Sequence, residues 1–193
     1  MNLTPQQLAI CTGASLPVAI RFLPSVTHAM KEYGIDSYYE QAAFLANIGH
    51  ESGGFKWMTE LWGPTLAQSR YEGRADLGNV KPGDGKLFRG HGALQVTGRF
   101  NHARVRDNLR KKFPKLYVPD FELGPQILSE PEWAMLSAAD FWTQNNIGRF
   151  AAAKDFDGCC DAVNRGRKTA PVGDSNGWKE RLKLFTEGLK ALL

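Results

Sequence analysis

The chain has 193 residues, of which 42% are hydrophobic, and this size and composition are typical of one domain with a substantial core. No apolar run approaches the roughly 20 residues of a membrane-spanning helix, and the N-terminus lacks the basic and apolar regions of a signal peptide. The net charge of +4 favours contact with an anionic polymer, such as nucleic acid, an acidic cell-wall glycan or a membrane surface.

The first quarter of the chain predicts three helices. Thr4-Pro5-Gln6-Gln7 combines an N-cap, a proline in the first turn and a capping-box glutamine, so a short helix begins here. A second helix covers residues 17–33. Ser37-Tyr38-Tyr39-Glu40 is another capping box, and the helix that follows it runs to Glu51, where Ser52-Gly53-Gly54 ends it.

The third predicted helix carries a carboxylate at the end of an apolar face. Phe44, Ile48 and Glu51 are spaced i, i+4, i+7 and therefore share one side of the helix. A carboxyl at the edge of an apolar surface loses hydration, and this favours the protonated form that a general acid needs. Glu51 is therefore a candidate acid, although most glutamates at helix ends are solvated surface residues.

The segment after this helix predicts a short extended structure. Large apolar residues alternate with polar ones from Phe55 to Trp62, which is typical of a strand or extended turn. Glu60 lies beyond a glycine break, so it is a candidate second carboxylate for cleavage of a glycosidic bond, although a second surface glutamate is the commoner case. Four aromatic residues near the two glutamates offer flat faces to sugar rings or belong to the core; they are Phe55, Trp57, Trp62 and Phe88.

Further helices follow a long connection. Residues 63–92 are rich in glycine and charge, and a connection of this length is usually functional or mobile. A basic helix covers 99–112, another opens at Ser129-Glu130-Pro131-Glu132, and a last one opens at Ser175 or Asn176. The predicted fold is α+β and predominantly α-helical, with a small extended segment.

Two separated motifs resemble the family 19 glycoside hydrolases, which include plant-type chitinases and many phage endolysins with a lysozyme-like fold. The motifs are Phe44 to Phe55, with the sequence FLANIGHESGGF, and Phe88 to Asn101, with the sequence FRGHGALQVTGRFN. The resemblance continues through residues 138–142, Val163-Asn164 and Arg181, and it covers most of the chain from about Leu3. It implies a single catalytic domain over 1–193, with no separate cell-wall-binding module and no cofactor.

The resemblance also implies roles for individual residues. Glu51 matches the catalytic acid, Glu60 matches the carboxylate that deprotonates or orients the attacking water, and Thr97 matches a residue that holds this water. The residues expected to bind or surround the sugar are Gln95, Asn101, Asn164, Arg181, Trp62 and His50.

Three features depart from the family pattern. His91 stands where the family often has arginine, and Arg165 stands where a glycine commonly follows the asparagine. The long insertions of plant chitinases are absent, which favours the bacteriolytic branch of the family.

Metal binding is not expected, because the histidines, at positions 28, 50, 91 and 102, lack the spacing of metal ligands. The cysteines, at positions 11, 159 and 160, have no disulfide or zinc pattern, and we expect buried, unreactive thiols. The basic run from Arg99 to Lys112 is expected to be a solvated helix face or a contact for an anionic polymer.

These observations predict an endolysin-like muramidase that hydrolyses β-1,4 bonds of peptidoglycan glycan strands. The alternatives are a chitinase, a lytic transglycosylase that uses Glu51 alone, and a glycan-binding protein without activity. A nucleic-acid-binding module is a weaker alternative, based on the faint helix-turn-helix pattern between Leu8 and Phe22. We expect a monomer, made in the cytoplasm without a signal peptide or stable membrane insertion. It would act on the cell wall after a separate protein has permeabilised the membrane.

Overall fold

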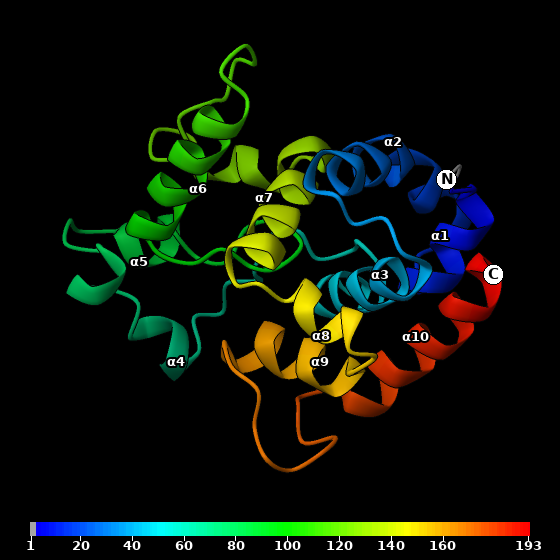
Figure 1. Ribbon diagram of the computed structural model, residues 1–193. Helices are drawn as coiled ribbons and strands as arrows, with labels where there is room; N and C mark the ends of the chain where they lie inside the picture. The colour runs from blue at the N-terminus through cyan, green and yellow to red at the C-terminus, as the bar shows by residue number, and fades with distance from the viewer. Residues whose placement is uncertain (1–2) are drawn as a thin grey trace.

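Helices follow one another along the computed structural model, which describes residues 3–193 (Figure 1). The longer helices are α1 (Pro5–Thr12), α2 (Leu16–Tyr33), α3 (Tyr38–Ser52), α6 (Arg99–Lys112), α7 (Pro131–Gln144), α9 (Phe156–Arg165) and α10 (Trp178–Leu192). The shorter helices are α4 (Leu66–Ser69), η1 (Ala75–Leu77), α5 (Asp84–Leu87), η2 (Pro125–Ser129) and α8 (Gly148–Ala152). The predominantly helical fold predicted from the sequence is confirmed.

Local capping explains where the N-terminal helices begin. Thr4 and Gln7 each accept a hydrogen bond from the other's backbone N–H, and this completes the predicted capping box of α1. Ser37 likewise caps α3 by accepting the N–H of Glu40 at 3.2 Å. The second capping box is only half formed, because the Glu40 carboxylate accepts the indole N–H of Trp142 at 3.0 Å.

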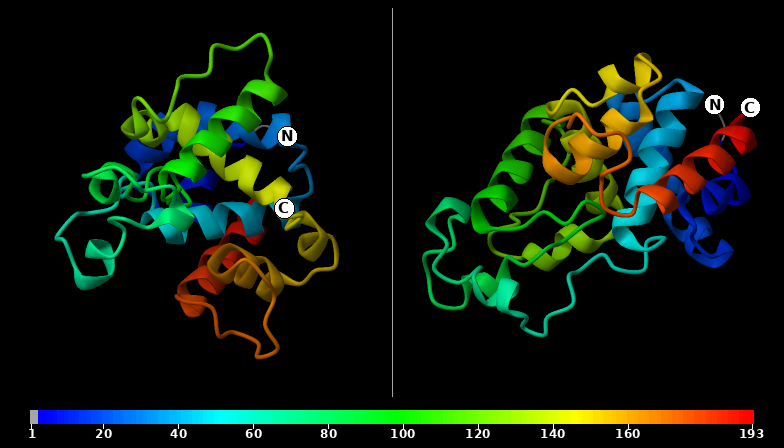
Figure 2. Two further views of the ribbon diagram at one scale, coloured as in Figure 1. Left: turned by 90° about the vertical axis from the view of Figure 1, so that its left-hand side faces the viewer. Right: turned by 90° about the horizontal axis from the view of Figure 1, so that it is seen from below.

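Helix α3 is the central element of the fold. It packs against α1, α8, α9 and α10, while α2 packs against α7 (Figure 2). A Cβ on Gly49 would lie 2.5 Å from the carbonyl oxygen of Thr12, so only glycine allows α1 to approach α3 this closely. At the ends of the chain, the Gln7 amide donates to the carbonyl oxygen of Ala191 at 2.8 Å. The C-terminal end of α3, which carries Glu51, is thus supported by helices from both ends of the chain.

The predicted extended segment is present but shorter than expected. Isolated antiparallel bridges join Thr59 to His91 and His91 to Val96, and residues 3–193 contain no longer strand. Phe55 adopts a left-handed backbone with φ of 65° and stacks on Phe22, with the ring centroids 4.7 Å apart. The chain therefore turns after α3 before it becomes extended. The bridge from Thr59 to His91 joins the segment that follows the first motif to the second motif.

The glycine-rich stretch 63–92 contains three short helices and is held in place by an ion pair and by hydrogen bonds. The Arg99 guanidinium donates to both carboxylate oxygens of Asp84, at 2.5 and 3.1 Å. This pairing holds the pKa of the buried Asp84 below its ordinary value. The Glu72 carboxylate accepts the backbone N–H groups of Gly83 and Gly85, at 2.6 and 2.8 Å. The long connection is thus an ordered part of the fold.

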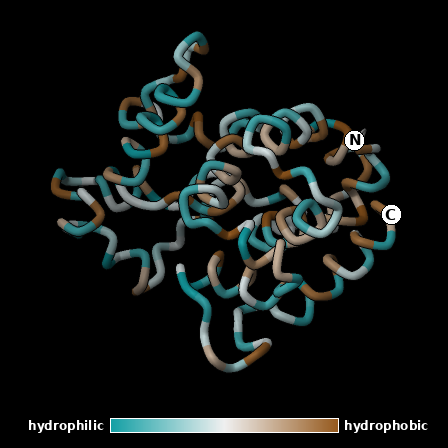
Figure 3. Tube along the Cα trace, viewed as in Figure 1, coloured by the Kyte–Doolittle hydropathy of each residue, from teal (hydrophilic) through white to brown (hydrophobic). Residues whose placement is uncertain are grey.

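Hydrophobic and hydrophilic residues alternate along the helices instead of forming one long hydrophobic segment (Figure 3). Within residues 3–193, no single helix is long and apolar enough to cross a membrane. Helix α1, which belongs to the faint helix-turn-helix pattern, packs against α2, α3 and α10. The three cysteines are free and buried, as predicted.

Candidate active site

Glu51 lies in the last turn of α3 with its side chain 25% exposed. The guanidinium of Arg181, which is 1% exposed on α10, donates from Nη2 to Oε1 of Glu51. The same guanidinium donates from Nη1 to the Asn47 side chain at 2.6 Å and from Nε to the Asn176 carbonyl at 2.9 Å. In the described part of the chain, no residue hydrogen-bonds to Oε2 of Glu51. The carboxyl is thus fixed through one oxygen, and the other is free.

The surroundings of Glu51 differ in part from the prediction. Phe44 and Ile48, on the same face of α3, are fully buried as expected. The carboxylate nevertheless contacts the guanidinium of Arg181, so its surroundings are not as apolar as predicted. Arg181 follows Glu51 by 130 residues, so helical periodicity around Glu51 gave no signal of this contact.

Asn164 extends the same polar network. Its side-chain oxygen accepts the N–H of Asn176 at 3.1 Å, and the carbonyl of Asn176 binds Arg181. Asn164, Arg181 and Glu51 were each predicted as site residues, and the structure brings all three together. Arg165, the neighbour of Asn164, points elsewhere, since its guanidinium binds the Asp174 carboxylate within the loop that follows α9.

His50 contacts α10 and the turn before it. Its Nδ1 lies 2.7 Å from a carboxylate oxygen of Glu180. A Cβ on Gly177 would lie 2.0 Å from the His50 ring, so glycine is required where the chain enters α10. The partner of His50 is therefore Glu180, which was not predicted from the sequence.

Glu60 is held by three hydrogen-bond donors. Its Oε1 accepts from the Gln68 amide at 3.0 Å and from the Tyr71 hydroxyl at 3.4 Å, and its Oε2 accepts from the Gly90 N–H at 2.9 Å. Partial burial and the neighbouring Glu60 charge raise the pKa of Tyr71 above its ordinary value. These three donors fix the position of both carboxylate oxygens. Sequence analysis identified Glu60 but missed Gln68 and Tyr71.

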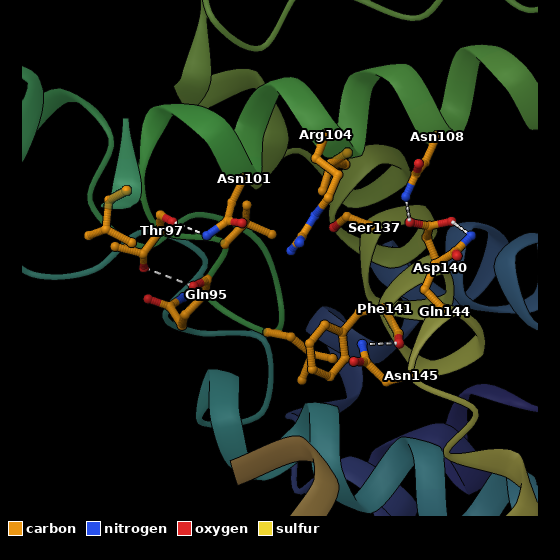
Figure 4. Close-up of a pocket in the computed structure, with 14 residues that line it drawn as sticks. Gln95, Thr97, Asn101, Arg104, Asn108, Ser137, Asp140, Phe141, Gln144 and Asn145 are labelled. Carbon is orange, nitrogen blue, oxygen red and sulfur yellow. Dashed lines mark hydrogen bonds between the residues drawn. The ribbon is translucent and has the colours of Figure 1, made fainter. Parts of the chain in front are cut away.

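Gln95, Thr97 and Asn101 line one cavity of about 510 Å³ beside α6 and α7 (Figure 4). The Thr97 hydroxyl donates to the Gln95 carbonyl at 2.9 Å, and the Asn101 amide donates to the Thr97 carbonyl at 2.6 Å. Gln95 has a left-handed backbone, with φ of 51°, and its amide donates to the Gly92 carbonyl at 2.9 Å. Glu51 and Glu60 do not line this cavity. The predicted residues therefore fall into three groups, around Glu51, around Glu60 and around Thr97.

The aromatic candidates divide between core and surface. Phe55 and Phe88 are buried, so the interpretation of these two rings as sugar-binding faces is wrong. Trp57 is 42% exposed. Trp62 is half-buried, and its ring centroid lies 6.3 Å from that of Tyr71, beside Glu60. Trp62 and Trp57 therefore remain candidates for packing against a sugar ring.

His91, which departs from the family pattern, belongs to the core. Its Nδ1 lies 3.0 Å from Nε2 of His102, and Nδ1 of His102 lies 2.9 Å from the Gly98 carbonyl oxygen. Burial lowers the pKa of His91 to about 3 and that of His102 to about 4, so both rings are neutral at pH 7. Residues 3–193 contain no group of three His, Cys, Asp or Glu side chains arranged to hold a metal ion.

Comparison with known proteins shows what the chain is similar to in sequence. No family model matches the chain. A glycosyl hydrolase family 19 domain-containing protein of Haemophilus influenzae is 29% identical over 109 residues, which cover 42% of this chain and 54% of that protein. The match thus spans about half the length of this curated relative.

The fold has a counterpart among solved structures. The crystal structure of chitinase C from Streptomyces griseus HUT6037 superimposes with a TM-score of 0.70, at 19% identity, and covers 98% of this chain and 76% of that chain. This likeness confirms the predicted fold. The chain is thus similar in sequence to a family 19 domain protein and similar in fold to a protein described as a chitinase.

Proposed function

We propose that the chain is an endolysin-like muramidase, which hydrolyses the β-1,4 bonds of peptidoglycan with Glu51 as general acid and Glu60 as the carboxylate that activates water. The observation that carries the proposal is the contrast between the two glutamates. Glu51 has one oxygen bound to Arg181 and one oxygen free, whereas both oxygens of Glu60 accept hydrogen bonds. Glycosidic cleavage needs one carboxyl group as the acid and one that activates water, and two carboxyl groups in different environments suit these two roles.

In this mechanism Glu51 donates its proton from Oε2 to the oxygen of the departing sugar. Arg181, itself held by Asn47 and Asn176, fixes the orientation of the carboxyl through Oε1 and leaves the other oxygen for the substrate. After the proton leaves, the guanidinium stabilises the resulting carboxylate.

Glu60 acts at the other side of the scissile bond. It is held by Gln68, Tyr71 and Gly90, and it takes a proton from the water that attacks the anomeric carbon. Thr97 helps to hold this water. An inverting displacement of this type requires about 6.5–9.5 Å between the two carboxyl groups. If Glu60 is dispensable and the product is an anhydro sugar, the reaction is that of a lytic transglycosylase with Glu51 alone.

Chitin is the second candidate substrate, favoured by the likeness in fold to a protein described as a chitinase. The same two carboxylates would cleave a neutral polymer of N-acetylglucosamine. Peptidoglycan is preferred because the net charge of +4 suits an acidic polymer and because the long insertions of plant chitinases are absent.

The decisive test compares Glu51→Gln, Glu60→Gln and a matched control, Glu187→Gln, on the exposed face of α10. Release of reducing ends from purified sacculi and from chitin oligomers is measured, with mass spectrometry of the products. Both site variants should lose about 10²-fold or more in kcat while they remain folded, and the control should match the wild type. Wild-type turnover in Glu51→Gln would reject the assignment of the acid, and faster turnover of chitin than of sacculi would reject peptidoglycan.

A further inference from the structure

Arg104 differs from the other arginines of α6. Arg99 binds Asp84, Arg106 binds Asp120 and Glu122, and Arg110 donates to a backbone carbonyl. Arg104 is exposed, and no described residue forms an ion pair or hydrogen bond with it. Its guanidinium extends from α6 into the same cavity that Thr97 and Asn101 line (Figure 4). The cavity thus presents one free cation.

The same cavity presents amide oxygens. The side-chain N–H groups of Asn101, Asn108 and Asn145 donate to oxygens of the protein, at 2.6 to 2.8 Å. No described donor binds the carbonyl oxygens of these three amides, so they are free to accept hydrogen bonds from a ligand. Phe141 adds a partly exposed ring to the wall. A cation next to several acceptors suits a ligand that carries both a carboxylate and N–H groups.

The cavity also contains a buried anion, Asp140. Its carboxylate accepts hydrogen bonds from Asn108 at 2.8 Å, from Tyr33 at 3.3 Å and from Gln144 at 3.4 Å. None of these three donors is a cation, so none of them forms an ion pair with the Asp140 carboxylate. A bound carboxylate therefore belongs at Arg104, and N–H or ammonium groups of the ligand belong near Asp140.

We propose that this cavity binds the peptide stem of a peptidoglycan strand, with a stem carboxylate paired to Arg104 and stem N–H groups bound by the amide oxygens. The proposal rests on the proposed function and specifies how the enzyme distinguishes peptidoglycan from chitin. A guanidinium binds a carboxylate through two parallel hydrogen bonds, whereas a neutral chitin oligomer offers it no charge. Arg104 is thus a specificity-determining residue.

The test uses Arg104→Gln and Arg104→Lys, with Arg21→Gln as the matched control. Arg21 is an exposed arginine of α2 whose described contact is with the Phe22 ring, so its substitution removes the same charge away from the cavity. We measure kcat/KM on peptide-bearing glycan strands, on strands stripped of peptide and on chitin oligomers. Arg104→Gln should lose about tenfold or more on the peptide-bearing strands alone, Arg104→Lys should lose less, and Arg21→Gln should match the wild type.

An equal loss on chitin oligomers, or no loss on peptide-bearing strands, would overturn the proposal. An equal loss on stripped strands would overturn the assignment to the peptide, because the lactyl carboxylate would then be the partner of Arg104. Binding of the three substrates to Glu51→Gln protein, with and without Arg104→Gln, gives a readout that needs no turnover. If the wild type cleaves none of them, the proposed hydrolase activity fails, while the binding measurement still decides the role of Arg104.

Discussion

The side-chain amide of Gln68 donates to Oε1 of Glu60 at 3.0 Å, while its carbonyl oxygen accepts the N–H of Thr65 at 2.8 Å. Gln68 is buried in α4 and also donates to the Leu61 carbonyl at 2.6 Å. One side chain therefore joins the second carboxylate to the first turn of a short helix. The orientation of Glu60 depends on whether α4 is formed.

Replacement of Gln68 by Leu should lower kcat about tenfold with little change in KM, since Glu60 loses its closest side-chain donor and is oriented by Tyr71 and Gly90 alone. Tyr71→Phe is the matched control, because it removes a longer bond, 3.4 Å, to the same oxygen. Its effect should be smaller. Steady-state kinetics on sacculi, with thermal unfolding to verify folding, checks both variants. Equal kcat values in Gln68→Leu and the wild type would show that Glu60 needs no positioning by α4.

Replacement of Arg181 by Leu should lower the free energy of unfolding by about 2–4 kcal/mol, because the buried oxygen of Asn47 and the Glu51 carboxylate lose their donor together. Glu51→Gln should cost less than about 1 kcal/mol, since the amide oxygen still accepts from Arg181. Urea unfolding of both variants measures the difference. Equal losses in the two variants would contradict this account of the network.

The His91 and His102 pair predicts a loss of stability in mild acid. Their pKa values in the folded protein, about 3 and about 4, lie below the ordinary 6.5. Below pH 6.5 the unfolded chain takes up protons that the folded chain does not, so the stability is fully present above pH 6.5 and falls toward pH 4. At pH 5 each histidine costs about 2 kcal/mol, from 1.4 kcal/mol per pH unit.

Two measurements check this pH dependence. Urea unfolding between pH 4 and 8 should show the decline below pH 6.5. The ring resonances of His91 and His102 in NMR spectra should remain those of neutral imidazole at pH 5. Titration of either ring with a midpoint near 6.5 would show that the pair is accessible to solvent.

Local sequence signals predicted much of the helical fold. The capping box of α1 and the bounds of α6 agree with the structure, because a cap or a breaker lies within a few residues of each end. Helix α8 has only five residues, too few to show a period. Helix α9 is capped by Asp155, whose carboxylate accepts the N–H of Gly158, but no capping-box residue or long apolar pattern identified the helix from the sequence.

The candidate site was predictable only where its residues lie within a motif. Glu51 and Glu60 were recognised from short patterns, and Arg181 and Asn164 through the family resemblance. Glu180 was missed because its contact with His50, 130 residues away, depends on how distant segments pack. Gln68 was missed because its bond to Glu60 depends on the turn that separates them. For His91 the sequence showed only a departure from the family pattern. Its contact with His102 became visible in the structure.

The two glutamates are tethered independently of each other. The contacts of Glu51 come from α3, α10 and the residues before α10, whereas those of Glu60 come from α4, Tyr71 and Gly90. No hydrogen bond in the described chain joins one set to the other. A small rigid-body movement of one region relative to the other therefore changes the distance between Glu51 and Glu60. Every hydrogen bond to either glutamate is kept during such a movement. Substitutions at the packing surfaces between them offer a means to tune the reaction without touching a site residue.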